Sequence, residues 1–428
     1  MVNRILGDTR EGAIRMNGES LRKTDPAVAA LLEAERDRQA RTIDLIASEN
    51  LCPAPVREAV ASVLTDKYAE GYPGARYYGG CAVADQVEQL AIDRGKRLFG
   101  CDHINVQVHS GSQANMAVYL ALLAPGDTIL SMDLAHGGHL THGLKANFSG
   151  TFYRIAHYGV SRRDEQIDYD AVARQARQVR PALLIAGASA YPRAIDAARL
   201  AQIARDVGAR LLVDMAHFAG LVVAGVHPDP VPVADFVTAT THKTLRGPRG
   251  GIAMCKDEYA KALDHAVFPG LQGGPLLHVI AGKAVAFALA MTEPFKAYQR
   301  QVVANARAMA DEMARAGDRI VSGGTDTHLF LVDLGSRRIA GAQAERWLER
   351  AGIVANKNPV PFGPPAPSQW SGIRIGTPNV TSRGAREDEV RTIARWIDRI
   401  LRAEDPEKAA DALRGEVLAF CQAHPIPD

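Results

Sequence analysis

The chain has 428 residues, of which 47% are hydrophobic and 23% charged, and its formal net charge is +2. These fractions match ordinary soluble globular proteins and exclude disordered, collagen-like and coiled-coil classes. Fifty basic residues against 48 acidic ones create no overall field that attracts nucleic acid or an anionic membrane, so neither is expected as a partner. The longest apolar runs, such as residues 117–124, are far shorter than the ~20 residues of a membrane helix.

Cysteine usage and the N-terminus indicate a reducing compartment. The five cysteines are odd in number, widely spaced and without a CxxC pair, which argues against a zinc ribbon or a disulfide framework. The first residues have no apolar run of the kind found in signal peptides. We therefore expect a cytoplasmic protein.

The first part of the chain predicts an arm, a helix and a loop. Residues 1–22 are polar with mixed charge, which is typical of a loosely attached arm. Asp25 and Pro26 then supply a helix cap and a first helical turn. Residues 66–81 are rich in glycine and tyrosine and form no amphipathic element, so we expect a loop that carries chemistry there.

Short apolar runs then alternate with helical stretches between residues 85 and 280. The runs cover residues 104–108, 127–132, 182–189, 210–215 and 235–241, and the helical stretches include residues 112–123 and 197–208. This alternation predicts an α/β fold with a mostly parallel central sheet and helices on both faces.

A helical stretch near residues 277–317 leads to further strand candidates at residues 328–334 and 372–378. These strands predict a smaller α+β domain after the large one. We expect three parts in the chain. They are an N-terminal arm and helix over residues 1–65, a large cofactor-binding domain over residues 66–295 and a C-terminal domain over residues 296–428.

Polar residues of catalytic types follow the predicted strands directly. They are Ser110, Ser189, Asp214 and His242. Because ligands of open parallel sheets bind outside the carboxyl ends of the strands, this placement predicts one shared site.

Lys243 and Asp214 are the most informative of these candidates. Lys243 follows the run at residues 235–241, and a lysine partly removed from water can form a Schiff base with a carbonyl compound; the alternative is an ordinary surface lysine. Asp214 either caps the next helix or is the anion that keeps a pyridine nitrogen protonated. His217 would then lie against the same ring or hydrogen-bond to it.

Three further features suggest binding groups. Ser110, Gly111 and Ser112 open a predicted helix, where free N–H groups bind anions; the alternative is a plain helix cap. No dinucleotide or P-loop fingerprint is present. Arg374 lies inside an apolar strand and requires an anion, which is either a substrate carboxylate or an internal salt-bridge partner.

Histidines at positions 136, 139 and 142 could be read as a metal cluster. Gly137 and Gly138 interrupt a regular helix there, and no HExxH motif is present. A flat imidazole stacked on a planar cofactor ring is an equally good use of one of them. Together, the phosphate turn, lysine, ring-nitrogen carboxylate, histidine and arginine describe a pyridoxal-phosphate enzyme that acts on an amino acid.

At these residues the chain resembles the serine hydroxymethyltransferases, which are fold-type I pyridoxal-phosphate enzymes. The resemblance runs from about residue 20 to about residue 400. Eight motifs match in the family's order: LIASEN (45–50), KYAEGYPGARYYGG (67–80), HSGSQAN (109–115), HGGHLTHG (136–143), VDMAHFAG (213–220), TTHKTLRGPRGG (240–251), FPGLQGGP (268–275) and SGIRIGTP (371–378).

The resemblance implies how the cofactor is held and what the enzyme does. Lys243 would bind pyridoxal 5'-phosphate covalently, Asp214 would contact the pyridine nitrogen and His139 would stack on the ring. The other implied cofactor contacts are Ser110, Gly111, Ser112, Ser189, His217, His242, Tyr68, Gly273 and Gly274. The implied reaction is reversible Cα–Cβ cleavage of serine to glycine, with transfer of the one-carbon unit to tetrahydrofolate.

The resemblance also implies substrate contacts and a second subunit. Ser48 and Arg374 would hold the substrate carboxylate, Glu70 would shuttle protons and Tyr78 would be an active-site tyrosine. The implied folate contacts are Glu70, Tyr77, Leu134, Gly138, Leu140 and Asn358. Tyr68, Glu70 and the Gly273–Gly274 turn would reach across from a second copy, so a homodimer is expected and a tetramer is left open.

One segment departs from the family's pattern. The chain has APSQWSG at residues 366–372 where the family has a sequence close to SPFVTSG. Ser368 stands in place of a folate-contacting phenylalanine, and Trp370 replaces a small threonine. This change motivates one alternative, an α-methylserine hydroxymethyltransferase or a folate-independent aldolase or transaldolase of the same family.

Two alternatives from other classes are weighed as well. The first is a metal-dependent hydrolase that uses His136, His139, Asp214 and His217. The second is a non-catalytic binding scaffold, which would make Lys243 and Arg374 incidental.

Overall fold

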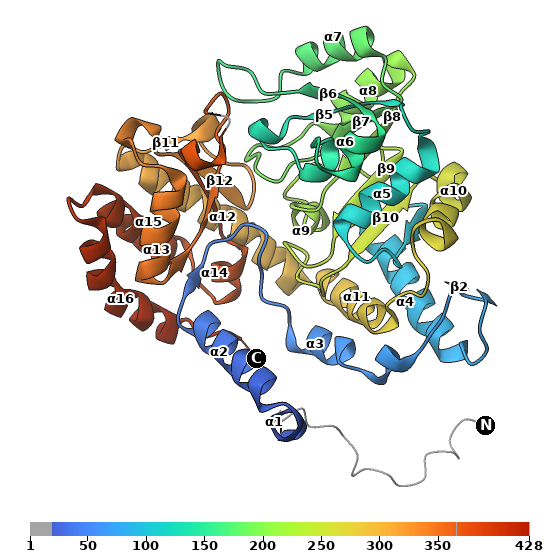
Figure 1. Ribbon diagram of the computed structural model, residues 1–428, viewed down its shortest axis with the longest axis horizontal. Coiled ribbons are helices and arrows are strands. Elements are labelled where there is room, and N and C mark those ends of the chain that lie inside the picture. The colour runs from blue at the N-terminus through green and yellow to red at the C-terminus, as the bar shows by residue number, and fades with distance from the viewer. Residues whose placement is uncertain (1–18, 365, 428) are drawn as a thin grey trace.

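The computed structural model describes residues 19–364 and 366–427 (Figure 1). Most of the arm expected over residues 1–22 therefore lies outside the described residues. The described part of the chain begins with α1 (Glu19–Thr24) and α2 (Pro26–Ala40). Asp25 caps α2 as predicted, because its carboxylate accepts a hydrogen bond from the Val28 N–H at 3.0 Å. None of the helices in this described part is long and apolar enough to cross a membrane.

The centre of the molecule is a seven-stranded sheet with the order β4-β10-β9-β8-β7-β5-β6. Its strands are β4 (His103–Asn105), β5 (Thr128–Met132), β6 (Arg154–Tyr158), β7 (Leu183–Ala186), β8 (Arg210–Asp214), β9 (Phe236–Thr240) and β10 (Gly251–Cys255). β10 runs antiparallel to both of its neighbours, β4 and β9, and all the other pairs in the sheet are parallel. The predicted mostly parallel sheet is confirmed, although β6 and β10 were not predicted and β4 ends before residues 106–108.

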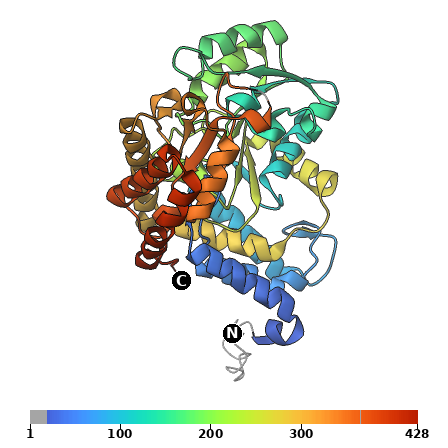
Figure 2. The ribbon, with the colours of Figure 1, turned by 60° about the vertical axis from the view of Figure 1, so that its left-hand side comes forward.

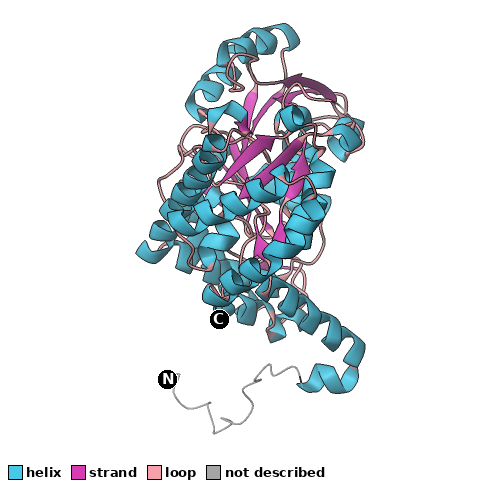
Figure 3. Ribbon diagram, turned by 90° about the vertical axis from the view of Figure 1, so that its left-hand side faces the viewer, coloured by secondary structure: helices cyan, strands magenta, loops and turns pink. Residues whose placement is uncertain are grey.

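Helices cover both faces of this sheet, as expected (Figure 3). Side chains alternate between two hydrophobic clusters: Leu184 of β7 packs in one, while Leu183 and Ile185 pack in the other. The first cluster includes α4 (Ala82–Phe99), α7 (Tyr169–Val179), α8 (Ala197–Val207) and α11 (Leu277–Ala290). The second includes α5 (Gly111–Leu122) and α10 (Ala260–His265).

A second, smaller sheet lies beside the large one (Figures 1 and 2). It is antiparallel with the order β11-β12-β15-β14, formed by β11 (Arg319–Ile320), β12 (Leu329–Asp333), β15 (Gly372–Gly376) and β14 (Asn356–Asn358). Its helices are α13 (Gly341–Ala351), α14 (Pro378–Ser382), α15 (Glu387–Arg402) and α16 (Pro406–Ala423). A short parallel pair, β1 (Ile43–Asp44) with β13 (Ile353–Val354), attaches the N-terminal segment to this unit.

The helical stretch expected near residues 277–317 consists of two helices, α11 and α12 (Glu293–Arg315). Phe295 and Val303 of α12 pack in the core of the large sheet, whereas Ala308 and Met309 pack in the core of the small one. The domain boundaries at residues 65 and 295 stay predictions, since one helix contributes to both cores.

Candidate active site

Lys243 lies directly after β9 at the wall of a cavity of about 500 Å³, which we call the lysine cavity. Its side chain is buried, and burial lowers the pKa of Lys243 to about 8 although Asp214 opposes the shift. A larger share of neutral amine is therefore present near neutral pH than in an exposed lysine. The neutral amine is the form that attacks a carbonyl carbon.

The lysine cavity collects most of the predicted cofactor and substrate residues. They come from the ends of strands in the large sheet, from the segment after β1 and from β15. Those that line it are Ser48, Ser110, Gly111, Ser112, His139, Ser189, Asp214, His217, His242, Lys243 and Arg374. The cavity is also lined by Thr240, Arg249 and Glu49. No role was predicted for these three residues from the sequence.

Asp214 is held as an anion at the end of β8. Its Oδ2 accepts hydrogen bonds from Asn115 at 2.9 Å and from the His142 ring at 3.0 Å, and its Oδ1 accepts from the Ala216 N–H at 3.0 Å. Burial would raise the pKa of Asp214, but these hydrogen bonds and the nearby histidines outweigh burial and hold it below its ordinary value. A charged carboxylate therefore faces the cavity, as a protonated pyridine nitrogen requires.

His142 links the His139 backbone to Asp214. Its Nδ1 accepts a hydrogen bond from the His139 N–H at 3.3 Å, which leaves the Nε2–H to donate to Asp214. From the sequence, His142 was predicted only as one of three regularly spaced histidines. The spacing of three residues from His139 was the available signal for His142. The contact with Asp214 could not be predicted, because Asp214 is 72 residues away in sequence.

Two further histidines line the cavity. Burial lowers the pKa of the half-buried His139 to about 4, so its ring is neutral, and its Nδ1 lies 2.7 Å from the Thr141 hydroxyl. Burial also lowers the pKa of His217, whose Nδ1 lies 3.2 Å from Nε2 of His328. His328 was not predicted to have a role, because its partner lies 111 residues away in the chain.

The predicted anion turn stands at the N-terminus of α5. Ser110 caps the helix with its hydroxyl, which accepts a hydrogen bond from the Gln113 N–H at 3.2 Å. Ser110, Gly111 and Ser112 all line the lysine cavity, so the free N–H groups of the first helical turn lie beside it. The helix cap and the predicted anion site are therefore compatible. The Ser110 hydroxyl caps the helix, while the whole turn faces the cavity.

Arg374 is half-buried on β15, and burial lowers its pKa to about 10. It donates hydrogen bonds to the Ser189 carbonyl at 2.8 Å and to the Asn356 side chain at 3.1 Å. Among residues 19–364 and 366–427, no carboxylate forms an ion pair with it. The internal salt bridge weighed from the sequence is therefore wrong, and Arg374 lines the lysine cavity.

Ten predicted residues do not line the lysine cavity in this chain, and six of these are Tyr68, Glu70, Tyr77, Tyr78, Gly273 and Gly274. These six gather instead at another surface. A Cβ atom built on Gly273 would lie 3.0 Å from Glu70 Oε1, and one on Gly274 would lie 3.1 Å from the Tyr68 ring. The tyrosines stand exposed, with 57% of Tyr68 and 80% of Tyr77 accessible to solvent.

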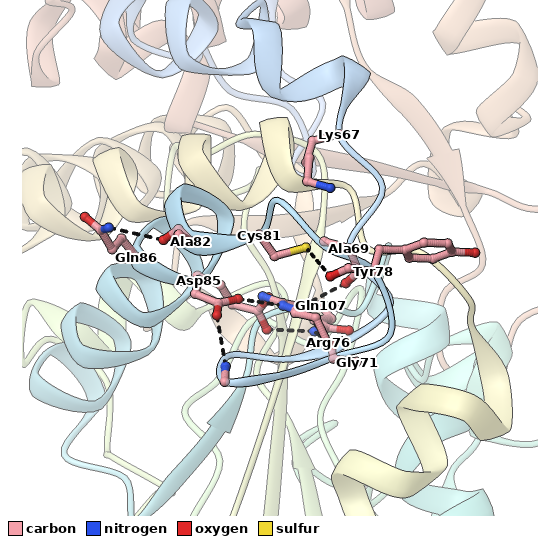
Figure 4. A network of polar contacts seen from close by, with 12 residues as sticks. Lys67, Ala69, Gly71, Arg76, Tyr78, Cys81, Ala82, Asp85, Gln86 and Gln107 are labelled. Carbon is pink, nitrogen blue, oxygen red and sulfur yellow. Dashed lines mark hydrogen bonds and ion pairs between the residues drawn. The ribbon is translucent and has the colours of Figure 1, made fainter.

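The loop over residues 66–81, which contains β2 (Gly71–Tyr72) and β3 (Ala75–Arg76), is held from beneath by buried charges (Figure 4). Arg76 pairs with Asp85 at 2.8 Å and with the fully buried Glu88 at 2.6 Å. Gln107 joins Glu88 to the carbonyl of Gly71, with distances of 2.7 and 2.8 Å. The loop is therefore anchored although Tyr68, Tyr77 and Tyr78 are exposed.

Four predicted folate residues come together in a second cavity of about 320 Å³, which we call the Trp370 cavity. They are Leu134, Gly138, Leu140 and Asn358. Trp370 forms part of the same wall, while Ser368 is exposed and does not line it. His139 and Ser189 line both this cavity and the lysine cavity, so the two adjoin.

The four residues of the metal-hydrolase alternative are not brought together. His136 accepts a hydrogen bond from the Val160 N–H at 3.0 Å and packs on Phe362, outside the lysine cavity. Ligand atoms of His139, His142 and Asp214 do lie within 4.8 Å of one another. These side chains, however, already hydrogen-bond to each other or to Thr141 and Asn115, so nothing in the structure favours this alternative.

The residues of the lysine cavity fit pyridoxal phosphate by their chemistry. A helix N-terminus with serines suits a phosphate, a lysine of lowered pKa suits a carbonyl carbon, and an ionised carboxylate suits a ring nitrogen. The cavity also has the volume of a small-molecule site. Fold and site together define a pyridoxal-phosphate enzyme of fold-type I.

Comparisons with known proteins give the particular family. The family model described as Serine hydroxymethyltransferase matches residues 21–397. A protein of Myxococcus xanthus (strain DK1622) named "Serine hydroxymethyltransferase" is 55% identical over 410 residues, which cover 96% of this chain and 98% of that protein. The chain therefore belongs to the serine hydroxymethyltransferase family, and the predicted fold-type I architecture, the enzyme class and the pyridoxal-phosphate cofactor are confirmed.

Proposed function

We propose that the lysine cavity and a second copy of the chain together carry the serine hydroxymethyltransferase reaction, the reversible conversion of serine to glycine with tetrahydrofolate as co-substrate. Bound pyridoxal phosphate supplies an electron sink for the negative charge left on Cα when the Cα–Cβ bond breaks. Lys243 would hold its carbonyl carbon, Asp214 would keep a proton on its ring nitrogen, and Ser110, Gly111 and Ser112 would hold its phosphate.

Arg374 would bind the carboxylate of the amino acid. Its buried charge has no carboxylate partner in the described chain, and its fork of N–H groups suits a carboxylate. Ser48 lines the same cavity and would donate a further hydrogen bond. Two fixed points on the substrate orient its Cα–Cβ bond, which lowers the entropic part of the barrier. This unpaired arginine beside a buried lysine is the observation that carries the proposal.

A second copy of the chain would complete the site. Tyr68, Glu70 and the Gly273–Gly274 turn lie together on an exposed surface away from Lys243. Apolar residues of α2 also stand exposed, with Val28 at 42%, Leu31 at 70% and Leu32 at 55%. A symmetric dimer would bury such faces twice and place Glu70 and Tyr78 of each copy in the cavity of the other. Glu70 would then exchange protons with the substrate.

Folate would occupy the Trp370 cavity. Leu134 and Leu140 offer an apolar wall and Asn358 an amide, and the cavity adjoins the lysine cavity through His139. Glu70 and Tyr77 of the second copy would reach the same region. The altered segment at residues 366–372 thus contributes an indole to the wall instead of the phenylalanine expected from the family. Nothing in the structure favours the α-methylserine, aldolase or transaldolase alternatives.

The protein's location also belongs to this proposal. The five cysteines, Cys52, Cys81, Cys101, Cys255 and Cys421, are free thiols. Free thiols fit a reducing compartment, and we place the enzyme in the cytoplasm.

The test is serine cleavage by the purified enzyme with and without tetrahydrofolate, run beside α-methylserine. We expect a yellow protein that borohydride bleaches, rapid cleavage of serine only with tetrahydrofolate, and slower turnover of α-methylserine. Equal rates of serine cleavage with and without tetrahydrofolate would overturn the assignment of Trp370 to a folate wall. A colourless protein that binds no pyridoxal phosphate would overturn the role of Lys243.

A further inference from the structure

A buried lysine outside the lysine cavity supports the anion turn from behind. Lys283 lies on α11 with 1% of its surface exposed, and its ammonium donates to three backbone carbonyls. These belong to Val106 at 2.5 Å, Gly251 at 2.7 Å and Val108 at 3.1 Å. Burial lowers the pKa of Lys283 to about 7 although the charge of Glu88 opposes the shift. The three carbonyl acceptors satisfy the buried N–H groups of the side chain.

The carbonyls that Lys283 binds belong to a segment without a regular hydrogen-bond ladder. β4 ends at Asn105, and residues 106–109 run from there to the anion turn outside any strand or helix. Buried backbone groups of such a segment need partners. Lys283 supplies the donor for two of its carbonyls, and the Gly251 N–H adds a weaker bond to Val108 at 3.2 Å.

Gln272 holds the alternate positions of the same segment. Its side-chain amide donates to the Gln107 carbonyl at 3.0 Å, and its side-chain oxygen accepts from the His109 N–H at 3.1 Å. Lys283 and Gln272 therefore fix residues 106–109 from two sides. The next residue is Ser110, the first of the anion turn.

The packing around Lys283 leaves little room for the turn to shift. A Cβ atom on Gly251 would lie 2.4 Å from the Ser110 carbonyl oxygen, and one on Gly250 would lie 2.8 Å from Cε of Lys283. The start of β10 is thus in direct contact with both the turn and the lysine. Burial and, after it, the charge of Lys283 lower the pKa of His109, which directly precedes the turn.

We infer that Lys283 is a positioning residue for the phosphate group of the cofactor: its ammonium fixes the carbonyls of residues 106, 108 and 251, and so sets the place of the Ser110–Ser112 turn. This inference rests on the proposed placement of the phosphate at that turn. Lys283 would not touch the cofactor. Its loss would weaken binding of the phosphate in particular, rather than of the pyridine ring.

The test compares pyridoxal phosphate with pyridoxal, which lacks the phosphate, as ligands of the full-length protein freed of cofactor. In Lys283→Met we expect the Kd for pyridoxal phosphate to rise about tenfold or more, while the Kd for pyridoxal changes by less than about twofold. A merely structural role would weaken both ligands alike, or would only lower Tm. An unchanged ratio of the two Kd values would overturn the inference.

Two variants on other residues keep the test decisive. Phe287→Leu lies on the same helix and is fully buried, so it should lower Tm and leave the ratio unchanged. If Lys283→Met does not fold, Gln272→Leu takes its place and should also weaken pyridoxal phosphate selectively. Equal weakening of both ligands in Gln272→Leu would then overturn the inference.

Ser112→Ala separates this inference from the proposed function. If Ser112→Ala lowers the preference for pyridoxal phosphate and Lys283→Met does not, the phosphate placement stands and the role of Lys283 falls. If Ser112→Ala leaves the preference unchanged, the phosphate placement itself is wrong.

Discussion

The lysine cavity and the loop over residues 66–81 are both built from catalytic-type residues, but they differ in what surrounds those residues. Side chains of the cavity are buried and turned toward one another, as Asp214 is toward His142 and Asn115. In the loop, the side chains of Tyr68, Tyr77 and Tyr78 are exposed, with 57% of Tyr68 accessible to solvent. The loop backbone is nevertheless anchored, because the buried Arg76–Glu88 pair holds it.

An exposed loop that is anchored by buried charges is the kind of surface that the proposed second copy would need. Flexible surface loops do not need a fully buried glutamate and a buried arginine beneath them. The lysine cavity thus collects residues suited to a cofactor, whereas the loop presents at the surface residues whose chemistry belongs in such a cavity. Changes in the cavity should therefore have large effects within the same chain. Changes in the loop should have effects that another copy of the chain can complement.

Lys243→Ala should have the largest effect. Without the amine, the cofactor has no covalent attachment, and kcat/KM for serine should fall by about 10²–10⁴-fold or more. The yellow colour should be lost at the same time, which absorbance spectroscopy measures. Lys296→Ala, at a surface ion pair, is the matched control and should keep both colour and activity.

The pH dependence of cofactor uptake tests the environment of Lys243. The neutral amine reacts and the ammonium does not, so the rate at which cofactor-free enzyme takes up pyridoxal phosphate should rise as pH increases through about 8. Stopped-flow absorbance over a pH series measures this rate. A midpoint near the ordinary lysine value of ~10.4 would contradict the burial that the structure assigns to Lys243.

Glu70→Gln tests whether the loop acts in another copy. Alone, the change should lower kcat by about 10²-fold, as expected for loss of a proton-transferring group. Mixing it with Lys243→Ala under conditions that exchange subunits should restore about a quarter of the active sites, because half of the dimers then contain one native site. No recovery, with hybrid dimers present, would place Glu70 and Lys243 of one chain in the same site.

Arg374→Lys should have a smaller effect, confined to binding. The change keeps a positive charge but loses the two-pronged fork, so KM for serine should rise about 10- to 100-fold with a smaller change in kcat. Steady-state kinetics measure both. Arg395→Lys, at an exposed ion pair with Glu312, is the control. A fall in kcat at constant KM would show that Arg374 acts on the reaction rather than on the carboxylate.

The sequence predicted the large sheet well because buried parallel strands are short apolar runs between helices. It missed β10, whose residues follow a glycine-rich segment and run antiparallel to β9. It also missed β6, an edge strand with Arg154 and His157 exposed. The sequence of β6, RIAHY, is only partly apolar, whereas β10 is apolar and buried but follows the glycine-rich segment directly.

The candidate site was predictable where residues follow strands, as Asp214 and Lys243 do, or carry a family motif. The supporting residues were not predictable, because each acts through a partner distant in the chain. His142 is 72 residues from Asp214, and Lys283 is 177 residues from Val106. Such pairs share no local pattern; only the folded arrangement of strands and helices brings them together.

Trp370→Thr should have the smallest effect, and it tests the place where the cavity and the loop of a second copy would meet. The indole lines the Trp370 cavity with Leu140 and Asn358. Losing an aromatic contact should change KM for tetrahydrofolate by about 2- to 10-fold and leave KM for serine unchanged. Kinetics at varied tetrahydrofolate measure this, with Trp396→Phe, outside the cavity, as the control. An unchanged KM for both substrates would mean that folate does not contact the indole of Trp370. The unusual sequence at residues 366–372 would then have no part in folate recognition.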